Sequence, residues 1–433
     1  MVMNRELKNK LLGRKVLIWG ARIVGIGLRR KCSVENIEVV GFIDSDISIQ
    51  GKVMHGNRVY SPSEVSGVID SYSGHGITIV IAVSIKEEEI KRMLSTCIEG
   101  KQDTEIILYK HYNTIYYTID VVSSCNLSCM SCAHSLEGPK PGGIMKMEDV
   151  RSVLSKIKNE NPNCSHVSLY SWGEPLIHPQ LDEIIRLFHD EAIAVGLSTN
   201  LSHEDFKKIE RVLRANPDYL KISLSGYYQE AYQHTHQGGD IELVKSNLYK
   251  VAYLIRKLGL QTMVDINYHL YKDNSGENYA RMKDLAEELG FIMSEVYALV
   301  MPLERVLNER QGKPDKQTEE LQENLLVTIE EGVNASKQIN LEDGCPFMHN
   351  QMNINSDLSV PVCCLVYDRK YLVSNNYLED TLETIESRKD NSEICRTCMS
   401  YNLPQYNMGF NKGKWVQLAS EKICTDLGFN AKC

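Results

Sequence analysis

Short apolar runs and longer amphipathic stretches alternate along the first quarter of the chain. The apolar runs, each of strand length, are 16–19, 37–44, 77–83 and 104–110. Gly20 and Gly25 bracket a turn after the first run, and the pattern predicts a helix from about Lys86 to Glu99. Strands that alternate with helices predict a parallel α/β sheet. We expect this first domain to occupy residues 1–112.

A second alternation follows. It predicts strands at 114–122, 166–172, 194–200, 219–225, 261–271 and 294–300, with helices at 179–190, 203–214, 240–257 and 278–288. Six βα units in a row predict an open or partial (β/α)6 barrel over residues 113–310. In such folds the chemistry lies at the carboxyl ends of the strands. Residues 311–340, rich in Glu, Gln, Lys and Asn, predict a helical linker, and residues 341–433 form a cysteine-rich third domain.

Composition excludes several classes of function. The chain has 433 residues, which suggests two to four domains. A net charge of −9 and a pI near 5.8 give no basic face for a nucleic acid. No apolar run reaches the roughly 18 residues that span a bilayer. Charges at the N-terminus interrupt any apolar signal segment. We therefore expect a cytoplasmic protein that binds neither nucleic acid nor membrane.

Thirteen cysteines are a strong chemical signal. A disulfide framework is a poor fit to a chain of this size in a reducing compartment, so metal or cluster binding is favoured. Cys125, Cys129 and Cys132 follow the first barrel strand within eight residues. Three thiolates can hold a [4Fe–4S] cube and leave one iron open. The alternative is a zinc site, for which His134 would supply the fourth ligand.

A C-x3-C-x2-C motif after the first strand of a partial barrel resembles the radical S-adenosylmethionine (SAM) superfamily. The resemblance covers about 114–300. It implies that the open iron binds SAM, and that one electron cleaves SAM to a 5′-deoxyadenosyl radical, which abstracts hydrogen from an unactivated carbon. The electron would come from an external donor such as flavodoxin or ferredoxin.

Polar residues at successive strand ends fit the same resemblance. "SWGEP" at 171–175 resembles the GGEP motif, in which the glutamate binds the SAM ammonium. The residues that would hold SAM are Gly173, Glu174, Ser198, Asn200 and Ser223. The chain departs from the family at two places. Ser131 stands where an aromatic residue usually packs near adenine, and Ser171–Trp172 replaces the first glycine of the GGEP motif.

The cysteine-rich tail resembles the auxiliary-cluster region called SPASM or, when shortened, twitch. There, one cysteine precedes and one follows a hairpin, and a C-x2-C completes a second [4Fe–4S] cluster. The matching residues are Cys345, Cys363, Cys395 and Cys398. Leu358 replaces a common glycine, and Pro404 stands where a full SPASM domain has a further cysteine, which favours the twitch form. A zinc ribbon is the alternative. Cys364, Cys424 and Cys433 are left over.

A fully ligated auxiliary cluster would accept an electron from a substrate radical that has lost a proton, which oxidises an alcohol or amine carbon. Candidate proton acceptors are His269, Lys272 and Tyr271, of which His269 shares a strand face with Asn267. Hydrogen return from a thiol, with Cys424 as the candidate, would give epimerisation instead. Tyr228, His234 and His236 lie in a stretch at 227–239 that is either a substrate contact or a solvated loop.

The first domain carries a weak nucleotide signal. Its G-x-x-x-x-G turn has Arg22 where a dinucleotide fingerprint has a glycine, and Asp44 ends the second strand, where a ribose is often bound. The run from Lys15 to Val65 resembles the Rossmann-like domain of sugar acyltransferases. That resemblance implies a domain that handles nucleotide-linked sugars or only positions its partner. Gly20, Gly25 and Asp44 are the candidate nucleotide-binding residues, and a purely structural turn is the alternative.

The sequence thus predicts an α/β protein with a Rossmann-like parallel sheet, a partial barrel and a twitch/SPASM-like domain. The expected function is radical SAM oxidation or epimerisation of a sugar, free or nucleotide-linked, with two [4Fe–4S] clusters. A radical SAM peptide maturase is the second possibility. The non-enzymatic alternative is a zinc-stabilised nucleotide-sugar sensor.

Overall fold

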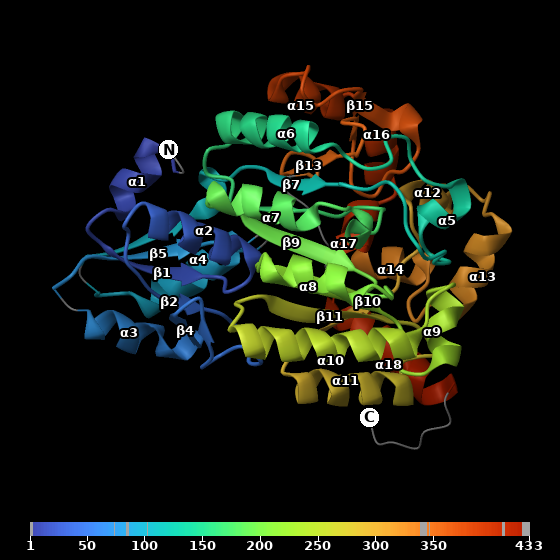
Figure 1. The fold of residues 1–433 in the computed structure, drawn as a ribbon, viewed down its shortest axis with the longest axis horizontal. Coiled ribbons are helices and arrows are strands. Elements are labelled where there is room, and N and C mark those ends of the chain that lie inside the picture. Colours follow the sequence, from blue (N-terminus) through green and yellow to red (C-terminus); the bar gives the residue numbers. More distant parts are fainter. Residues whose placement is uncertain are drawn as a thin grey trace.

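The computed structural model describes residues 3–72, 74–83, 86–101, 103–337, 344–345, 347–408 and 412–426. Figure 1 shows the N-terminal domain in blue beside a large central sheet, with the cysteine-rich segment in orange and red beyond it. No helix in these described ranges has the length and apolar character needed to cross a membrane. The structure confirms the predicted α/β class with its three regions.

The N-terminal domain is a six-stranded sheet in the order β3-β4-β2-β1-β5-β6. All neighbours are parallel except the pair β3–β4. The strands are β1 (Lys15–Trp19), β2 (Val39–Ile43), β3 (Val53–Met54), β4 (Asn57–Tyr60), β5 (Ile77–Ile81) and β6 (Thr104–Leu108). The helices are α1 (Arg5–Leu11), α2 (Ile23–Val34), α3 (Val65–Ser71) and α4 (Glu87–Cys97). β5 is buried along its whole length and β1 at all but its first residue, as expected for continuous apolar runs in a parallel sheet.

The central sheet has seven parallel strands in the order β12-β11-β10-β9-β8-β7-β13. They are β7 (Tyr116–Ile119), β8 (His166–Ser168), β9 (Ala194–Thr199), β10 (Tyr219–Leu224), β11 (Met263–Leu270), β12 (Ile292–Tyr297) and β13 (Gln351–Ile354). The six predicted strands are present, although β8 is shorter than expected. The seventh comes from the tail and pairs with β7, so part of the predicted third domain extends the barrel sheet.

Helices connect and follow the strands of this sheet along the chain. They are α5 (Ala133–Glu137), α6 (Met147–Glu160), α7 (Leu181–Asp190), α8 (Phe206–Arg214), α9 (Gln229–Thr235), α10 (Ile241–Leu258), α11 (Glu277–Leu289), α12 (Leu303–Arg310), α13 (Lys316–Asn324) and α14 (Ile329–Ser336). α9 shows that part of 227–239 is helical and not a loop. Ala231, Tyr232 and Thr235 are buried, whereas Tyr228 and His234 are exposed. The expected linker is helical, as predicted.

The C-terminal segment contains two short antiparallel strands and four helices. They are β14 (Val360–Pro361), β15 (Leu372–Ser374), α15 (Leu382–Asp390), α16 (Glu393–Ser400), α17 (Leu403–Met408) and α18 (Lys412–Asp426). A tight turn at 355–359 reverses the chain between β13 and β14. At this turn Leu358 adopts a left-handed backbone with φ of 68°, the conformation that favours glycine. This explains why a glycine is common at the position.

Helix α2 joins the first two domains. A Cβ on Gly27 would lie 2.0 Å from the carbonyl oxygen of Ser165, so only glycine allows this close approach to the central domain. Arg30 forms a 2.6 Å ion pair with the fully buried Asp218 at the start of β10. One apolar cluster contains residues of both domains, including Ile26 and Ala194. The N-terminal domain therefore covers the amino-terminal ends of the barrel strands.

Candidate active site

A cavity of about 250 Å³ lies at the carboxyl ends of the central strands. Its wall contains the three cysteines of the first motif and the polar residues predicted at the strand ends. The lining residues in these two groups are Cys125, Cys129, Cys132, Gly173, Glu174, Ser198, Asn200 and Ser223. These residues lie far apart in the sequence, on the loop after β7 and after or at the ends of β8, β9 and β10. They converge because the carboxyl ends of parallel strands meet at one edge of the sheet.

The cysteine loop is held by backbone hydrogen bonds to the residues around α9. Ser128 N donates to Gln237 O, and Met130 N donates to Thr235 O. Burial raises the pKa of the Cys125 thiol to about 11, and burial also raises the pKa of Cys129 and Cys132. Thiols in this environment ionise only when a positively charged group compensates them, which suits ligands of an iron–sulfur cluster.

His134, the fourth ligand of the zinc alternative, does not line this cavity. In the part of the chain that the structure describes, no three His, Cys, Asp or Glu side chains converge to hold one metal ion. Zinc needs its sulfur ligands about 2.3 Å from one centre. A four-iron cube offers a separate iron to each thiolate, so its ligands stand farther apart. A cluster held by the three thiols stays our prediction for this loop, and the zinc site with His134 stays the alternative.

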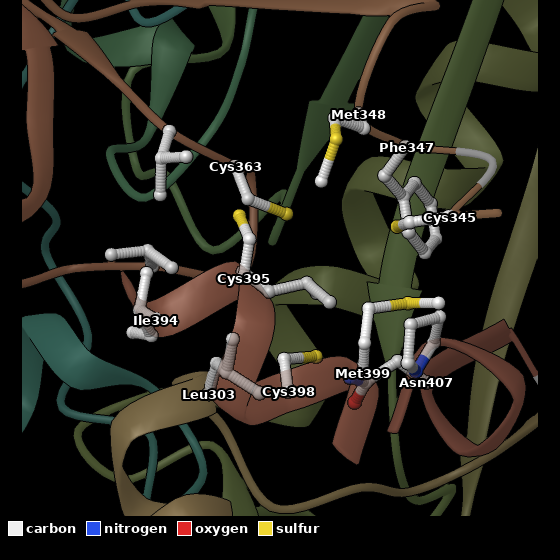
Figure 2. Close-up of a pocket in the computed structure, with 14 residues that line it drawn as sticks. Leu303, Cys345, Phe347, Met348, Cys363, Ile394, Cys395, Cys398, Met399 and Asn407 are labelled. Carbon is white, nitrogen blue, oxygen red and sulfur yellow. The ribbon is translucent and has the colours of Figure 1, made fainter. Parts of the chain in front are cut away.

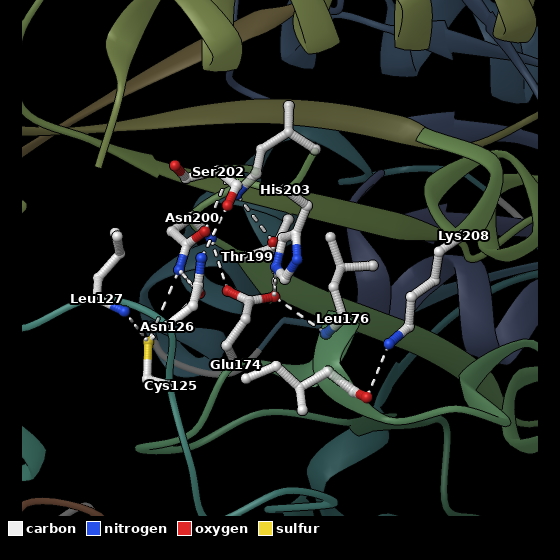
Figure 3. A network of polar contacts seen from close by, with 12 residues as sticks. Cys125, Asn126, Leu127, Glu174, Leu176, Thr199, Asn200, Ser202, His203 and Lys208 are labelled. Atoms are coloured by element: carbon white, nitrogen blue, oxygen red, sulfur yellow. Dashed lines mark hydrogen bonds and ion pairs between the residues drawn. The ribbon is translucent and has the colours of Figure 1, made fainter. Parts of the chain in front are cut away.

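Glu174 is the centre of a polar network (Figure 3). Its carboxylate accepts hydrogen bonds from the Leu176 amide at 3.0 Å, the Thr199 hydroxyl at 2.7 Å and the Asn200 amide at 2.9 Å. The Asn200 side chain donates to Asn126 at 2.9 Å and lies 3.7 Å from the Cys125 sulfur. The predicted glutamate and the cysteine loop are therefore parts of one network.

Thr199, Asn126 and Asp120 are site residues that sequence reasoning missed. Asp120 is buried at the end of β7 and accepts from the amides of Trp172 and Gly173. Burial raises its pKa to about 6. Asp120 could have been noticed in the sequence as the one carboxylate inside the strand predicted at 114–122. Gly173 itself is required by packing, since a Cβ there would lie 1.7 Å from the Val122 carbonyl oxygen.

Of the candidate proton acceptors, the structure brings His269 and Tyr271 to the cavity wall, and Lys272 is not on it. His269 hydrogen-bonds Asn267 at 3.1 Å, as expected from their shared strand face. Burial lowers the pKa of His269 to about 4 and raises that of Tyr271 to about 12. Both side chains are therefore neutral at neutral pH.

The candidate substrate contacts in the stretch 227–239, after β10, lie partly on the cavity wall and partly on the protein surface. His236 also lines the cavity, and burial lowers its pKa to about 3. His234 instead pairs with Asp273 at 2.5 Å on the surface, and Tyr228 hydrogen-bonds Glu277 there. Of this group, only His236 is placed to touch a molecule in the cavity.

The four tail cysteines predicted to act together line a second cavity (Figure 2). Cys345 and Cys363 approach from loops, and Cys395 and Cys398 from α16. The rest of the wall is almost wholly apolar, with Leu303, Phe347, Met348, Val362, Leu365, Val366 and Ile394 among its residues. Burial raises the pKa of Cys345 to about 11 and also that of Cys398. This donor set in a dry cavity fits a fully ligated cluster.

Of the leftover cysteines, Cys364 has a described side chain, and it is not on this cavity wall. Cys364 is beside Cys363, and a hydrogen bond between the two thiols is the largest cause of the raised pKa of Cys363. Cys424 lies within α18, but its side chain and the whole of Cys433 lie outside the described residues. Their predicted roles therefore stay predictions.

In the N-terminal domain the predicted nucleotide residues have structural partners. Asp44 accepts from the amides of Ala21 and Asp46, both at 2.9 Å, so it closes the turn itself. A Cβ on Gly25 would lie 1.8 Å from the Gly20 carbonyl oxygen. Arg22 is held by two carboxylates. Its guanidinium pairs with Asp46 at 2.7 Å and, across the domain boundary, with Asp265 at 3.1 Å.

Two family profiles match parts of the chain. Residues 119–286 match the Radical SAM superfamily, and residues 12–107 match a family described as C2185-like, N-terminal.

Curated relatives match over less than half of the chain. A "Probable GTP 3′,8-cyclase" of Methanococcus maripaludis strain C5 is 25% identical over 186 residues, which is 43% of this chain and 59% of the relative. An "AdoMet-dependent heme synthase" of Methanosarcina barkeri is 24% identical over 42% of this chain and 49% of the relative. The chain thus spans about half the length of these relatives.

Solved structures are similar over a larger share of the chain. The structure titled "Native anSMEcpe with bound AdoMet" aligns with a TM-score of 0.43 and 17% identity, over 64% of this chain and 82% of the other. The structure titled "Crystal structure of BtrN in complex with AdoMet and 2-DOIA" aligns with a TM-score of 0.36 and 12% identity, over 65% and 84%.

Proposed function

We propose that the protein, whose residues 119–286 match the Radical SAM superfamily, cleaves SAM reductively and uses the resulting 5′-deoxyadenosyl radical to oxidise a carbohydrate, free or nucleotide-linked. The observation that carries this proposal is the convergence of Cys125, Cys129 and Cys132 with Glu174 on one cavity. The cluster held by these thiolates would supply the electron that cleaves SAM, and a flavodoxin or ferredoxin would supply that electron to the protein.

Glu174 is prepared to bind a cation. A carboxylate has about four lone-pair sites. Leu176 and Thr199 occupy two on Oε1, and the amide of Asn200 occupies one on Oε2. One site on Oε2 remains for the ammonium group of SAM. The three existing donors fix the carboxylate in place, so no reorientation is needed when SAM binds.

The cavity wall suits a polyhydroxylated substrate. Hydroxyl, amide and imidazole groups that both donate and accept hydrogen bonds surround the space, among them Ser171, Ser198, Thr199, Asn200, Ser223, Thr235 and His269. Neutral His269 can accept the proton that an alcohol loses when its carbon radical is oxidised to a carbonyl. The electron lost in the same step would go to the second cluster, which Cys345, Cys363, Cys395 and Cys398 would hold.

We propose oxidation as the reaction, and epimerisation by hydrogen return from Cys424, whose side chain lies outside the described residues, stays the alternative. Hydrogen return needs a free thiol beside the substrate. Among the described residues, the thiols on the cavity wall are those of Cys125, Cys129 and Cys132, which the first cluster would occupy. The substrate radical would then lose a proton and an electron.

The test is anaerobic reconstitution followed by iron analysis and turnover. We expect about eight irons per chain, SAM cleavage with a strong reductant, and transfer of deuterium from a labelled sugar into 5′-deoxyadenosine. Stoichiometric zinc without SAM cleavage would support the sensor alternative. SAM cleavage with label transfer from a peptide and from no sugar would identify a peptide maturase.

A further inference from the structure

The interior face of the barrel carries a lysine that the proposed chemistry does not use. Lys221 lies on β10 and shares its inward face with Ser223, two residues later, which lines the active-site cavity. Lys221 is paired in register with Ser198 on β9, and its ammonium lies 4.8 Å from the centre of the Tyr170 ring. Its positive charge also contributes to lowering the pKa of His269. Lys221 is not itself on the cavity wall, but its ammonium lies against the wall residue Tyr170 and close enough to the wall residue His269 to act on it electrostatically.

The ammonium of Lys221 has unused hydrogen-bonding capacity. It carries three N–H donors. Within the described part of the chain its recorded contact is the aromatic ring of Tyr170, with no hydrogen bond or ion pair. Asp265 is its neighbour in register on β11. One oxygen of that carboxylate, Oδ2, accepts from Arg22, Ser294 and Tyr219, and the other, Oδ1, is buried without a hydrogen-bond partner among the described residues.

Lys221 is too deep to be a ligand of the cluster-bound end of SAM. SAM must lie against the cysteine loop, at the carboxyl ends of the strands. Lys221 is two residues closer to the start of β10 than Ser223, which places it about 7 Å deeper in the barrel. Because the pKa of His269 and that of His236 are both lowered far below neutrality, these imidazoles do not supply positive charge there.

We propose that Lys221 binds an anionic group of the substrate, so that the carbohydrate is an acidic one. A phosphate, as in a sugar phosphate or nucleotide sugar, and the carboxylate of a uronic acid share the chemistry that this subsite recognises. The anion would anchor the substrate deep in the barrel and direct its other end toward SAM. This inference rests on the proposed function.

The test measures binding to the SAM-loaded holoenzyme by calorimetry. The probes are UDP-glucose, glucose 6-phosphate, glucuronate and the uncharged methyl glucoside. We expect at least one anionic probe to bind about tenfold or more tightly than methyl glucoside. Binding of UDP-glucose or glucose 6-phosphate would identify the anion as a phosphate, and binding of glucuronate would identify it as a carboxylate. Lys221→Met should abolish the preference and Lys221→Arg should retain part of it. Lys257→Met removes a lysine with a similar ring contact on the outer helix α10, and it should change nothing.

Three results would overturn the inference. One is equal binding of charged and uncharged probes by the native protein while SAM is still cleaved, which leaves the proposed function standing. Another is a loss of SAM affinity instead of probe affinity in Lys221→Met. The third concerns the double variant Lys221→Met/Asp265→Asn. If it regains stability that Lys221→Met has lost and binds the probes as the native protein does, Lys221 is a counter-ion of Asp265. Conversely, anion binding without any SAM cleavage would remove the proposed function and leave the subsite.

Discussion

The hydroxyl of Thr199 donates a 2.7 Å hydrogen bond to the carboxylate of Glu174, and so ties the end of β9 to the loop after β8. Both side chains are buried. Hydrogen bonds to charged groups contribute about 1.5–3 kcal/mol each, because the partner left behind is desolvated. The position of Glu174 therefore depends on Thr199 as well as on its own backbone.

Replacement of Thr199 by valine should weaken SAM binding about tenfold, which is the low end of that range. Valine keeps the shape of threonine and removes the hydroxyl. The measurement is the dissociation constant of SAM for the anaerobic holoenzyme, with iron content checked to remain unchanged. Thr96→Val, on the surface of α4, is the control. Unaltered affinity in Thr199→Val would contradict the assigned role of Glu174.

Stability should fall as the pH is lowered from about 6.5 to 4, and His166 is one cause. Burial lowers the pKa of His166 from 6.5 to about 4. In this interval the unfolded chain binds a proton that the folded chain does not, so protonation favours unfolding. His166→Gln should flatten the profile by up to about 3 kcal/mol. Urea unfolding at a series of pH values checks this. An identical slope in the variant would show that His166 is not responsible.

The sequence predicts most of the fold because its local signals agree with the final structure. Apolar runs mark the buried parallel strands, and the polar residues after them lie at the same edge of the sheet. For this reason the three cysteines, Glu174 and Ser223 could be predicted to meet in one cavity before any geometry was known.

What the sequence did not indicate depends on contacts between distant segments. β13 is four residues long and contains two polar side chains, and nothing local shows that it pairs with β7. The left-handed backbone of Leu358 is set by a turn whose ends are fixed elsewhere. The G-x-x-x-x-G turn similarly suggested a nucleotide, but in the structure its residues close the turn and contact the barrel. The local sequence pattern could not distinguish a nucleotide-binding turn from a turn that only packs against the barrel.

The close packing of α2 on the barrel gives a third prediction. Gly27→Ala would place a methyl group 2.0 Å from the Ser165 carbonyl oxygen, so the domains must separate or the helix must shift. We expect destabilisation by about 1–3 kcal/mol, as for other overpacked sites. Gly67→Ala in α3 is a matched control, because its Cβ would meet nothing within 4 Å. That variant should be stabilised by about 0.5–1 kcal/mol. Chemical unfolding followed by circular dichroism measures both, and equal effects would contradict the interface.

The second cavity gives the last prediction, which separates adjacent cysteines. Cys363 lines the cavity with Cys345, Cys395 and Cys398, whereas Cys364 does not. Cys363→Ala should lower the iron content of anaerobically reconstituted protein from about eight to about four atoms per chain, since a four-iron cluster with three ligands in an apolar cavity is poorly held.

Cys364→Ala should retain all of the iron, and it differs from the first variant by one position in the same loop, so expression and folding effects are closely matched. Iron analysis and electron paramagnetic resonance of the reduced protein read out both clusters. If Cys364→Ala loses the iron and Cys363→Ala keeps it, the ligand is Cys364 and the loop after β14 must turn the other way. If neither variant loses iron, the four thiols do not hold a cluster, and substrate oxidation would require a different electron acceptor.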